Sequence, residues 1–198
     1  LKKWMEKCPM KQFTTLDTHD GIGIVDVKDL IPDEDIEKIK DQMYSQGANV
    51  KAIYNSEKYN NLDIYQVNTT YYSALGNNDK AYLLARAIQF FAPGIPQVYY
   101  VGMLAGANDI ELLEKTKNGR DINRHYYSVE EVEENQKREV VQGLKKLMIL
   151  RNTDPAFSLE GNIEIETEGD SLVITRSYLS NKITLKANLT TYDFEIIH

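Results

Sequence analysis

Apolar residues recur at helical spacing in three long stretches of the chain. The clearest helix is predicted over residues 79–91, where five apolar side chains fall on one face: Leu83, Leu84, Ala87, Ile88 and Phe91. Pro32 and the acids that follow it suit the first turn of a helix that reaches about residue 46. Ser128 and Glu131 form a capping box at the start of a third helix, predicted over residues 128–151. A shorter helix is predicted to end by Cys8, before Pro9.

Two short stretches rich in Thr, Phe and β-branched residues predict strands, over residues 11–18 and 95–101. Each runs directly into a loop that contains glycine. After Pro155 the pattern changes to strict alternation of apolar and polar residues, divided by Gly161, Gly169 and Asn181. This alternation predicts a run of antiparallel strands joined by hairpin turns.

These patterns predict an α/β chain in two parts. Strand–loop–helix units fill residues 1–152, and a small antiparallel β domain fills residues 153–198. A closed (β/α)₈ barrel needs about 250 residues, so the first part is predicted to be the terminal strand–helix units of such a barrel. The sequence begins with Leu1, and we therefore expect it to start inside a longer product.

The composition and charge of the chain argue against several classes of partner and cofactor. A net charge of −7 argues against nucleic acid and anionic membranes as partners. The sequence has neither a signal peptide nor a long apolar run, and its single cysteine, Cys8, suits a reducing cytoplasm. Its three histidines are far apart in sequence, and the loop at residues 102–106 lacks the lysine of a phosphate-binding loop. We therefore expect neither a metal nor another cofactor.

The strand-end pair of His19 and Asp20 is the strongest candidate for chemistry, because barrel enzymes keep their functional residues where strands end. The alternative is that Asp20 caps a turn and His19 satisfies a backbone carbonyl. Arg120 offers paired donors that suit sugar hydroxyls, or else it forms a structural ion pair with Asp121 or a neighbouring acid. We expect Arg124 and His125, rather than Arg120, to serve that structural role. The Asn- and Tyr-rich stretch up to residue 66 is typical of either a gating loop or a packed surface loop. The tyrosine pairs 71–72 and 99–100 are predicted to pack in the core.

Three segments in this order carry a resemblance to a known family: FTTLDTHDGIGIVDVKDLIPDEDI, LDIYQVNTTYYSALGNNDKAYLLARAIQFFAPGIPQVYYVGMLAG and NGRDINRHYYS. Together they resemble the sucrose phosphorylases, a branch of the α-amylase-type glycoside enzymes. The resemblance is close over about residues 5–157, whereas the C-terminal strands match only in type. It implies a retaining glucosyltransferase on a (β/α)₈ barrel, with sucrose, phosphate, glucose 1-phosphate and fructose as its small-molecule substrates.

The resemblance also implies roles for individual residues. Asp20 corresponds to the aspartate that stabilises the transition state, and His19 and Arg120 to residues that bind glucose. The motif LDIYQ corresponds to a mobile loop of the substrate site, with Asp63 as a fructose contact, Tyr65 as a phosphate contact, and Gln66 beside them. The nucleophile and the acid/base would lie upstream of Leu1, so the chain alone is expected to be inactive.

Other interpretations remain open from the sequence. Relatives with the same motifs act on phosphorylated sucrose or on a glucosyl polyol. A different class of function is a non-catalytic interaction or sugar-binding fragment. An unpaired barrel edge would favour self-association, and hence a homodimer.

Overall fold

The computed structural model describes residues 2–24, 27, 29–48 and 66–198. The chain divides into two compact units, and each of them combines segments that are distant in sequence. The first unit comprises Leu1–Leu16, Asp79–Gln97 and Arg138–His198. The second comprises Asp17–Asn78 and Val98–Lys137. The predicted domain boundary after residue 152 stays a prediction.

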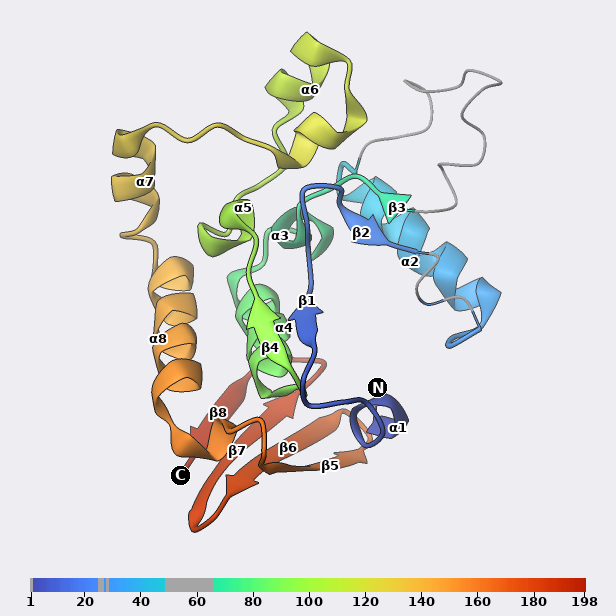
Figure 1. Ribbon diagram of the computed structural model, residues 1–198. Helices are drawn as coiled ribbons and strands as arrows, with labels where there is room; N and C mark the ends of the chain where they lie inside the picture. Colours follow the sequence, from blue (N-terminus) through green and yellow to red (C-terminus); the bar gives the residue numbers. More distant parts are fainter. Residues whose placement is uncertain (1, 25–26, 28, 49–65) are drawn as a thin grey trace. The chain divides into compact units, whose positions relative to one another are not determined.

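The first unit contains a four-stranded antiparallel sheet in the order β5–β6–β7–β8, drawn in orange to red in Figure 1. Its strands are β5 Asn162–Glu168, β6 Ser171–Tyr178, β7 Asn181–Asn188 and β8 Phe194–Ile197. Alternate side chains of these strands are buried: Ile165, Leu172, Ile174, Ile183, Leu185 and Ala187. The predicted run of antiparallel strands is confirmed.

Helix α4, Asp79–Phe91, has the predicted bounds and organises the rest of this unit. Beside it, β1 (Phe13–Thr15) and β4 (Ile95–Gln97) pair in parallel. The buried side chain of Gln89 donates to the backbone oxygens of Thr14, at 2.8 Å, and of Gln97, at 2.9 Å. One α4 side chain therefore ties the helix to both strands.

A buried arginine joins α4 to the antiparallel sheet. Arg176 lies on β6 and is fully buried. Its guanidinium donates to the carbonyl of Phe91 at 3.3 Å, that of Ala92 at 3.0 Å and that of Ser158 at 3.2 Å. It thus satisfies carbonyls at the end of α4, which lack helical partners. Helix α8, Glu139–Thr153, and the 3₁₀ helix η4, Pro155–Phe157, complete the packing around it.

The second unit has its own small core. Helix α2, Asp33–Ser45, forms where it was predicted, and β2 (Ile22–Gly23) pairs antiparallel with β3 (Gln66–Val67). Their buried side chains form one cluster: Ile24, Ile36, Met43, Ala48, Val67 and Ala74. The remaining named helices in the described ranges are short: α1 Lys2–Met5, α3 Tyr71–Ala74, α5 Tyr100–Met103, α6 Ile110–Thr116, η3 Gly119–Asn123 and α7 Val129–Asn135.

The prediction of one continuous helix over residues 128–151 is wrong. The structure has two helices instead, α7 Val129–Asn135 and α8 Glu139–Thr153, separated by an extended Arg138. The predicted capping box of Ser128 and Glu131 is confirmed. Helix α7 buries none of its side chains, so tertiary packing gives it no support for continuing as a longer helix.

The strand predicted over residues 95–101 is also too long, because β4 ends at Gln97 and α5 begins at Tyr100. Among the tyrosines predicted to lie in the core, Tyr72 is buried, whereas Tyr100 is 43% exposed. The hydroxyl of Tyr100 donates to the carbonyl of His125, which keeps the polar end of the ring at the surface.

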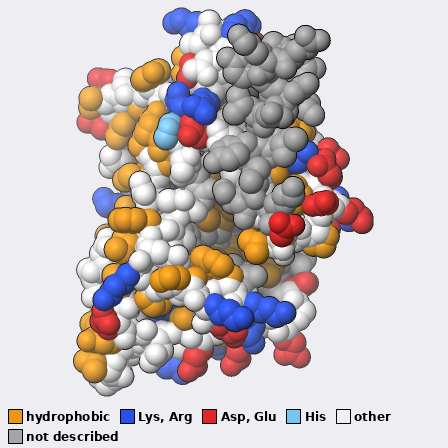
Figure 2. Space-filling model, turned by 45° about the vertical axis from the view of Figure 1, so that its right-hand side comes forward, with side chains coloured by type: hydrophobic (Ala, Val, Ile, Leu, Met, Phe, Trp, Pro, Cys, Tyr) orange, Lys and Arg blue, Asp and Glu red, His pale blue; other side chains and the backbone are white. Residues whose placement is uncertain are grey.

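The fold class is mixed α/β with an antiparallel sheet, as predicted in outline. On the face drawn in Figure 2, Lys and Arg side chains lie beside Asp and Glu side chains, consistent with their pairing in salt bridges such as that of Lys11 with Glu160. Among the described residues, no helix is both long and apolar enough to cross a membrane.

Candidate functional site

The site is built around a tight turn in the second unit. The backbone N–H of Gly21 donates to the carbonyl of Thr18 at 3.3 Å, and that of Asp20 to the Thr18 hydroxyl at 3.2 Å. Thr18 is thus the residue that caps the turn, which leaves the carboxylate of Asp20 available for other contacts. Gly21 closes the turn with a φ of +105°.

Replacing Gly21 by alanine is expected to lower the free energy of unfolding by about 3 kcal/mol, because two costs add. The φ of +105° is unfavourable for any residue with a Cβ atom, and that Cβ would overlap the carbonyl oxygen of Val67. Denaturant unfolding of the purified chain measures the loss.

Gly47 provides a matched control within the same unit. Its φ of +83° is also positive, but a Cβ built there meets no heavy atom of the described residues within 4 Å. Gly47→Ala should therefore cost only about 1 kcal/mol, which is the backbone strain alone. If both variants lowered the free energy of unfolding equally, steric overlap with β3 would not contribute to the cost at Gly21.

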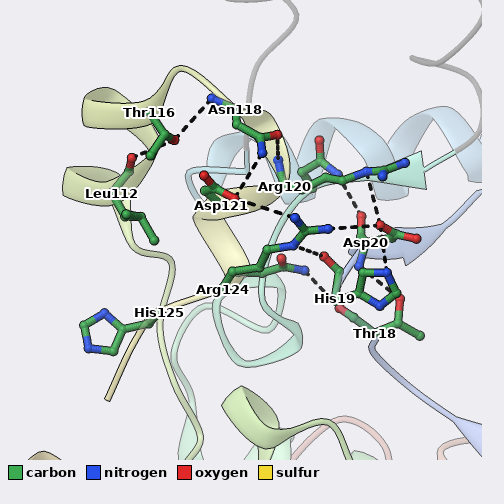
Figure 3. Close-up of polar contacts among 12 residues, drawn as sticks. Thr18, His19, Asp20, Leu112, Thr116, Asn118, Arg120, Asp121, Arg124 and His125 are labelled. Carbon is green, nitrogen blue, oxygen red and sulfur yellow. Dashed lines mark hydrogen bonds and ion pairs between the residues drawn. The ribbon is translucent and has the colours of Figure 1, made fainter. Parts of the chain in front are cut away.

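Three cationic or ionisable side chains converge on one oxygen of Asp20 (Figure 3). The Nε of Arg120 lies 3.1 Å from Oδ1, the Nη2 of Arg124 lies 3.4 Å from it, and the Nε2 of His19 lies 3.4 Å from it. The Asp20 side chain is 29% exposed, so this carboxylate is partly shielded and still open to a ligand.

Residues 119–125, called the arginine segment below, are held against the turn by hydrogen bonds from their side chains to its backbone carbonyls. Arg120 belongs to η3, Gly119–Asn123, and Arg124 follows it directly. The Nδ2 of Asn123 donates to the carbonyl of Thr18 at 3.1 Å, and the Nε of Arg124 to that of His19 at 3.0 Å. Two neighbouring carbonyls of the turn therefore each accept a hydrogen bond from the arginine segment.

A third carbonyl of the turn is held from the other side of the unit. The Nδ2 of Asn68, which follows β3, donates to the carbonyl of Asp20 at 2.7 Å. Segments near residues 20, 68 and 120 thus meet at one point. Side-chain donors thus hold three successive carbonyls of the turn that carries Asp20.

The structure brings together three of the predicted site residues, His19, Asp20 and Arg120. Asp63 and Tyr65 lie outside the described residues. Gln66 belongs to β3, where it pairs with Gly23. The alternative role suggested for Arg120, an ion pair with Asp121, falls to Arg124, which lies 3.7 Å from the Asp121 carboxylate.

Sequence reasoning missed several residues of this site. It assigned Arg124 a structural role and did not consider Asn68 or Asn123 at all. The available signal was a second arginine only four residues after Arg120, close enough in sequence to reach the same acceptor.

The arrangement leaves unused hydrogen-bonding groups beside the ion pairs. Within the described part of the chain, no donor lies on Oδ2 of Asp20, and the two terminal nitrogens of Arg120 have no acceptor. A carboxylate oxygen and a guanidinium edge are the groups that bind neighbouring hydroxyls of a polyol. The described ranges contain no group of three or more His, Cys, Asp or Glu residues arranged to hold a metal ion.

Comparison with known proteins gives relatives along almost the whole chain. The sucrose phosphorylase of Streptococcus mutans is 57% identical over 194 residues, which are 98% of this chain and 40% of that protein. The glucosylglycerol phosphorylase of Marinobacter adhaerens is 48% identical over 174 residues, covering 87% of this chain and 36% of that protein. No family model matches the chain.

The fold has a solved counterpart as well. The crystal structure of sucrose 6F-phosphate phosphorylase from Thermoanaerobacter thermosaccharolyticum matches with a TM-score of 0.87 and 45% identity, over 98% of this chain and 40% of that one. The chain thus spans about two fifths of the length of the relatives it matches. By sequence and fold, it belongs to the sucrose phosphorylase family and corresponds to the C-terminal part of these longer relatives.

Proposed function

We propose that the chain supplies part of the glucose site of a sucrose phosphorylase, with Asp20 as the carboxylate that stabilises the transition state and His19 and Arg120 as glucose contacts. The observation that carries the proposal is the convergence of Arg120, Arg124 and His19 on one oxygen of a partly shielded carboxylate. The high identity to a sucrose phosphorylase over 98% of the chain supports it.

The chemistry explains why such a carboxylate is needed. In retaining glucosyl transfer, the C1–O bond of sucrose breaks as a carboxylate nucleophile bonds to C1, and fructose leaves with a proton from the acid/base. Phosphate then attacks C1 and releases the nucleophile as glucose 1-phosphate forms. Both steps pass through an oxocarbenium-like transition state. Fixed negative charge next to the sugar ring stabilises that state in a shielded pocket.

Within this proposal, Asp20 uses its free Oδ2 to accept from a glucose hydroxyl, and the terminal nitrogens of Arg120 donate to the same edge of the sugar. Asp63, Tyr65 and Gln66 would contribute to the fructose and phosphate side. The parallel pair of β1 and β4 would be two strands of a (β/α)₈ barrel whose other strands, together with the nucleophile and the acid/base, belong to the preceding part of the enzyme.

A chimera tests the proposal directly. The matched C-terminal part of the Streptococcus mutans sucrose phosphorylase is replaced by this chain, and the product is incubated with sucrose and phosphate. We expect glucose 1-phosphate and fructose in equal amounts, whereas the 198-residue chain alone should produce neither. Enzyme-like rates from the chain alone, or a folded chimera without phosphorolysis, would contradict the proposal.

Two related substrate classes are tested in the same chimera. Relatives named glucosylglycerol phosphorylase and sucrose 6(F)-phosphate phosphorylase are 48% and 46% identical to the chain, so a glucosyl polyol and phosphorylated sucrose are offered in place of sucrose. We propose plain sucrose as the preferred substrate, because the motif LDIYQ resembles the sucrose type.

The non-catalytic interpretation predicts a different result. A fragment without a working glucose site would give no saturable change in the NMR signals of His19 when the chain is titrated with glucose.

We also propose a cytoplasmic enzyme that associates as a homodimer. Light scattering on the chimera measures that association.

A further inference from the structure

His125 lies between two carboxylates in the second unit. Its Nδ1 is 2.6 Å from Oδ2 of Asp109, and its Nε2 is 3.3 Å from Oε1 of Glu131. A neutral imidazole has one N–H donor, so it can donate to only one of these carboxylates. The geometry therefore matches the imidazolium, which donates to both.

Each of the two carboxylates uses its second oxygen to cap a helix. Oδ1 of Asp109 accepts from the backbone N–H of Leu112 at 2.8 Å, at the start of α6. Oε2 of Glu131 accepts from the backbone N–H of Ser128 at 2.7 Å, in the capping box of α7. The His125 ring thus links the first turns of two helices that flank the arginine segment in sequence.

The backbone of His125 is held as well. Its carbonyl accepts from the hydroxyl of Tyr100 at 2.8 Å, and its ring meets the ring of Tyr127 edge-on, with 4.5 Å between centroids. Just before it, the carbonyl of Ile122 accepts from the backbone N–H of Asp109 at 2.7 Å. The segment that carries Arg120 and Arg124 is therefore anchored at its C-terminal end through His125 and Asp109.

We propose that His125 is a positioning residue for the arginine pair: its doubly ion-paired ring fixes segment 119–125 so that Arg120 and Arg124 stay on Asp20. The inference rests on the proposed function only in assigning the arginine pair to the glucose site. It adds a residue whose ring contacts Asp109 and Glu131 and which acts on the arginine pair through the neighbouring backbone.

The electrostatics give this contact a pH dependence. Partial burial lowers the pKa of His125, but the hydrogen bonds and charges of Asp109 and Glu131 outweigh it and raise the pKa above 6.5. The pKa of Glu131 is lowered, first by the Ser128 backbone N–H and then by His125. Among the described residues, the phenol side chains of Tyr100 and Tyr127 also lie against His125.

Proton linkage gives the direction in which this stabilisation changes with pH. Because the folded state binds the His125 proton more tightly than the unfolded state, the stabilisation is complete below pH 6.5 and is lost as pH rises through the raised pKa. We therefore expect the arginine segment to loosen on the alkaline side of that pKa.

The test uses NMR of the 198-residue chain, with His125→Gln and Glu131→Gln as variants. Glutamine at 131 can still complete a capping box, so that variant removes the charge and keeps the helix start. In the parent chain, the His125 signals should titrate with a midpoint above 6.5, and Glu131→Gln should lower that midpoint. In His125→Gln, the Nε–H protons of Arg120 and Arg124 should exchange with solvent roughly 10-fold faster.

His198→Gln is the matched control, because His198 lies in the first unit, 3.2 Å from the carboxylate of Asp154. It should leave the arginine exchange rates unchanged. Unchanged arginine exchange in His125→Gln, or a His125 midpoint below 6.5, would overturn the proposal.

The chimera adds a functional readout. We expect the KM for sucrose of the parent chimera to rise on the alkaline side of the His125 pKa. His125→Gln should raise the KM about 10-fold with a smaller change in kcat, and it should remove that alkaline rise. An unaltered KM with an unaltered pH profile would contradict the inference. If the parent chimera is inactive, the proposed function fails, and the NMR measurements still decide the role of His125.

Discussion

In the chimera that carries this chain, Asp20→Asn should lower kcat/KM for sucrose phosphorolysis by about 10³-fold. Asparagine keeps the size of the side chain and removes its charge, so the electrostatic stabilisation of the oxocarbenium-like transition state is lost. The variant also loses the ion pairs with Arg120 and Arg124, at 3.1 Å and 3.4 Å. Initial rates of glucose 1-phosphate formation measure the effect.

Asp33→Asn serves as the matched control for this substitution. Asp33 lies exposed in the first turn of α2, and it makes the same change of charge away from the site. Its kcat/KM should stay within about two-fold of the parent, as is usual for surface substitutions. If Asp20→Asn also stays within that range, Asp20 does not stabilise the transition state and the proposed role is wrong.

The second large effect concerns stability. Arg176→Met should lower the free energy of unfolding by about 4 kcal/mol, because methionine fills only part of the volume and takes the guanidinium donors away from the buried carbonyls of Phe91 and Ala92. The partly buried carbonyl of Ser158 also loses its bond to Arg176 but keeps the backbone N–H of Gly161 at 3.1 Å. Burial, together with the nearby charge of Arg151, lowers the pKa of Arg176 to about 10, so the guanidinium is still protonated at pH 7.

Denaturant unfolding at pH 7 measures this loss, with two comparison variants. Arg176→Lys keeps the charge without the fork of donors, and it should fall between the parent and Arg176→Met. Lys186→Met removes an exposed cation from the neighbouring strand β7 and should change stability by less than about 0.5 kcal/mol. Similar stabilities for Arg176→Met and Lys186→Met would show that the buried carbonyls do not depend on Arg176.

Elements with a complete local signal were predicted well. The helix Asp79–Phe91 has an uninterrupted apolar stripe and a Pro-Gly stop, and its bounds are as predicted. The C-terminal strands alternate strictly and are divided by turn residues, which is sufficient for a hairpin sheet. In both cases the information lies within a few residues of the element, because periodicity and turn chemistry are local.

Elements whose limits depend on distant partners were predicted less well. The apolar run at residues 95–101 favours a strand throughout, yet β4 stops at Gln97, whose carbonyl accepts a hydrogen bond from the distant Gln89 side chain. Likewise, the stripe over residues 128–151 does not reveal that α7 buries no side chain. Propensity is a weak guide where packing decides the outcome.

The sequence by itself determined which residue types could form the site: a His-Asp pair at a strand end and an arginine in a polar segment, together with the family they resemble. Only the tertiary structure placed Arg124 beside Arg120 on Asp20, and joined Asn68 and Asn123 to the same turn. Contacts between residues 48 to 105 positions apart depend on how whole segments pack, and neither periodicity nor local propensity encodes that packing. The same holds for His125, whose two carboxylate partners appear only when α6 and α7 are in place.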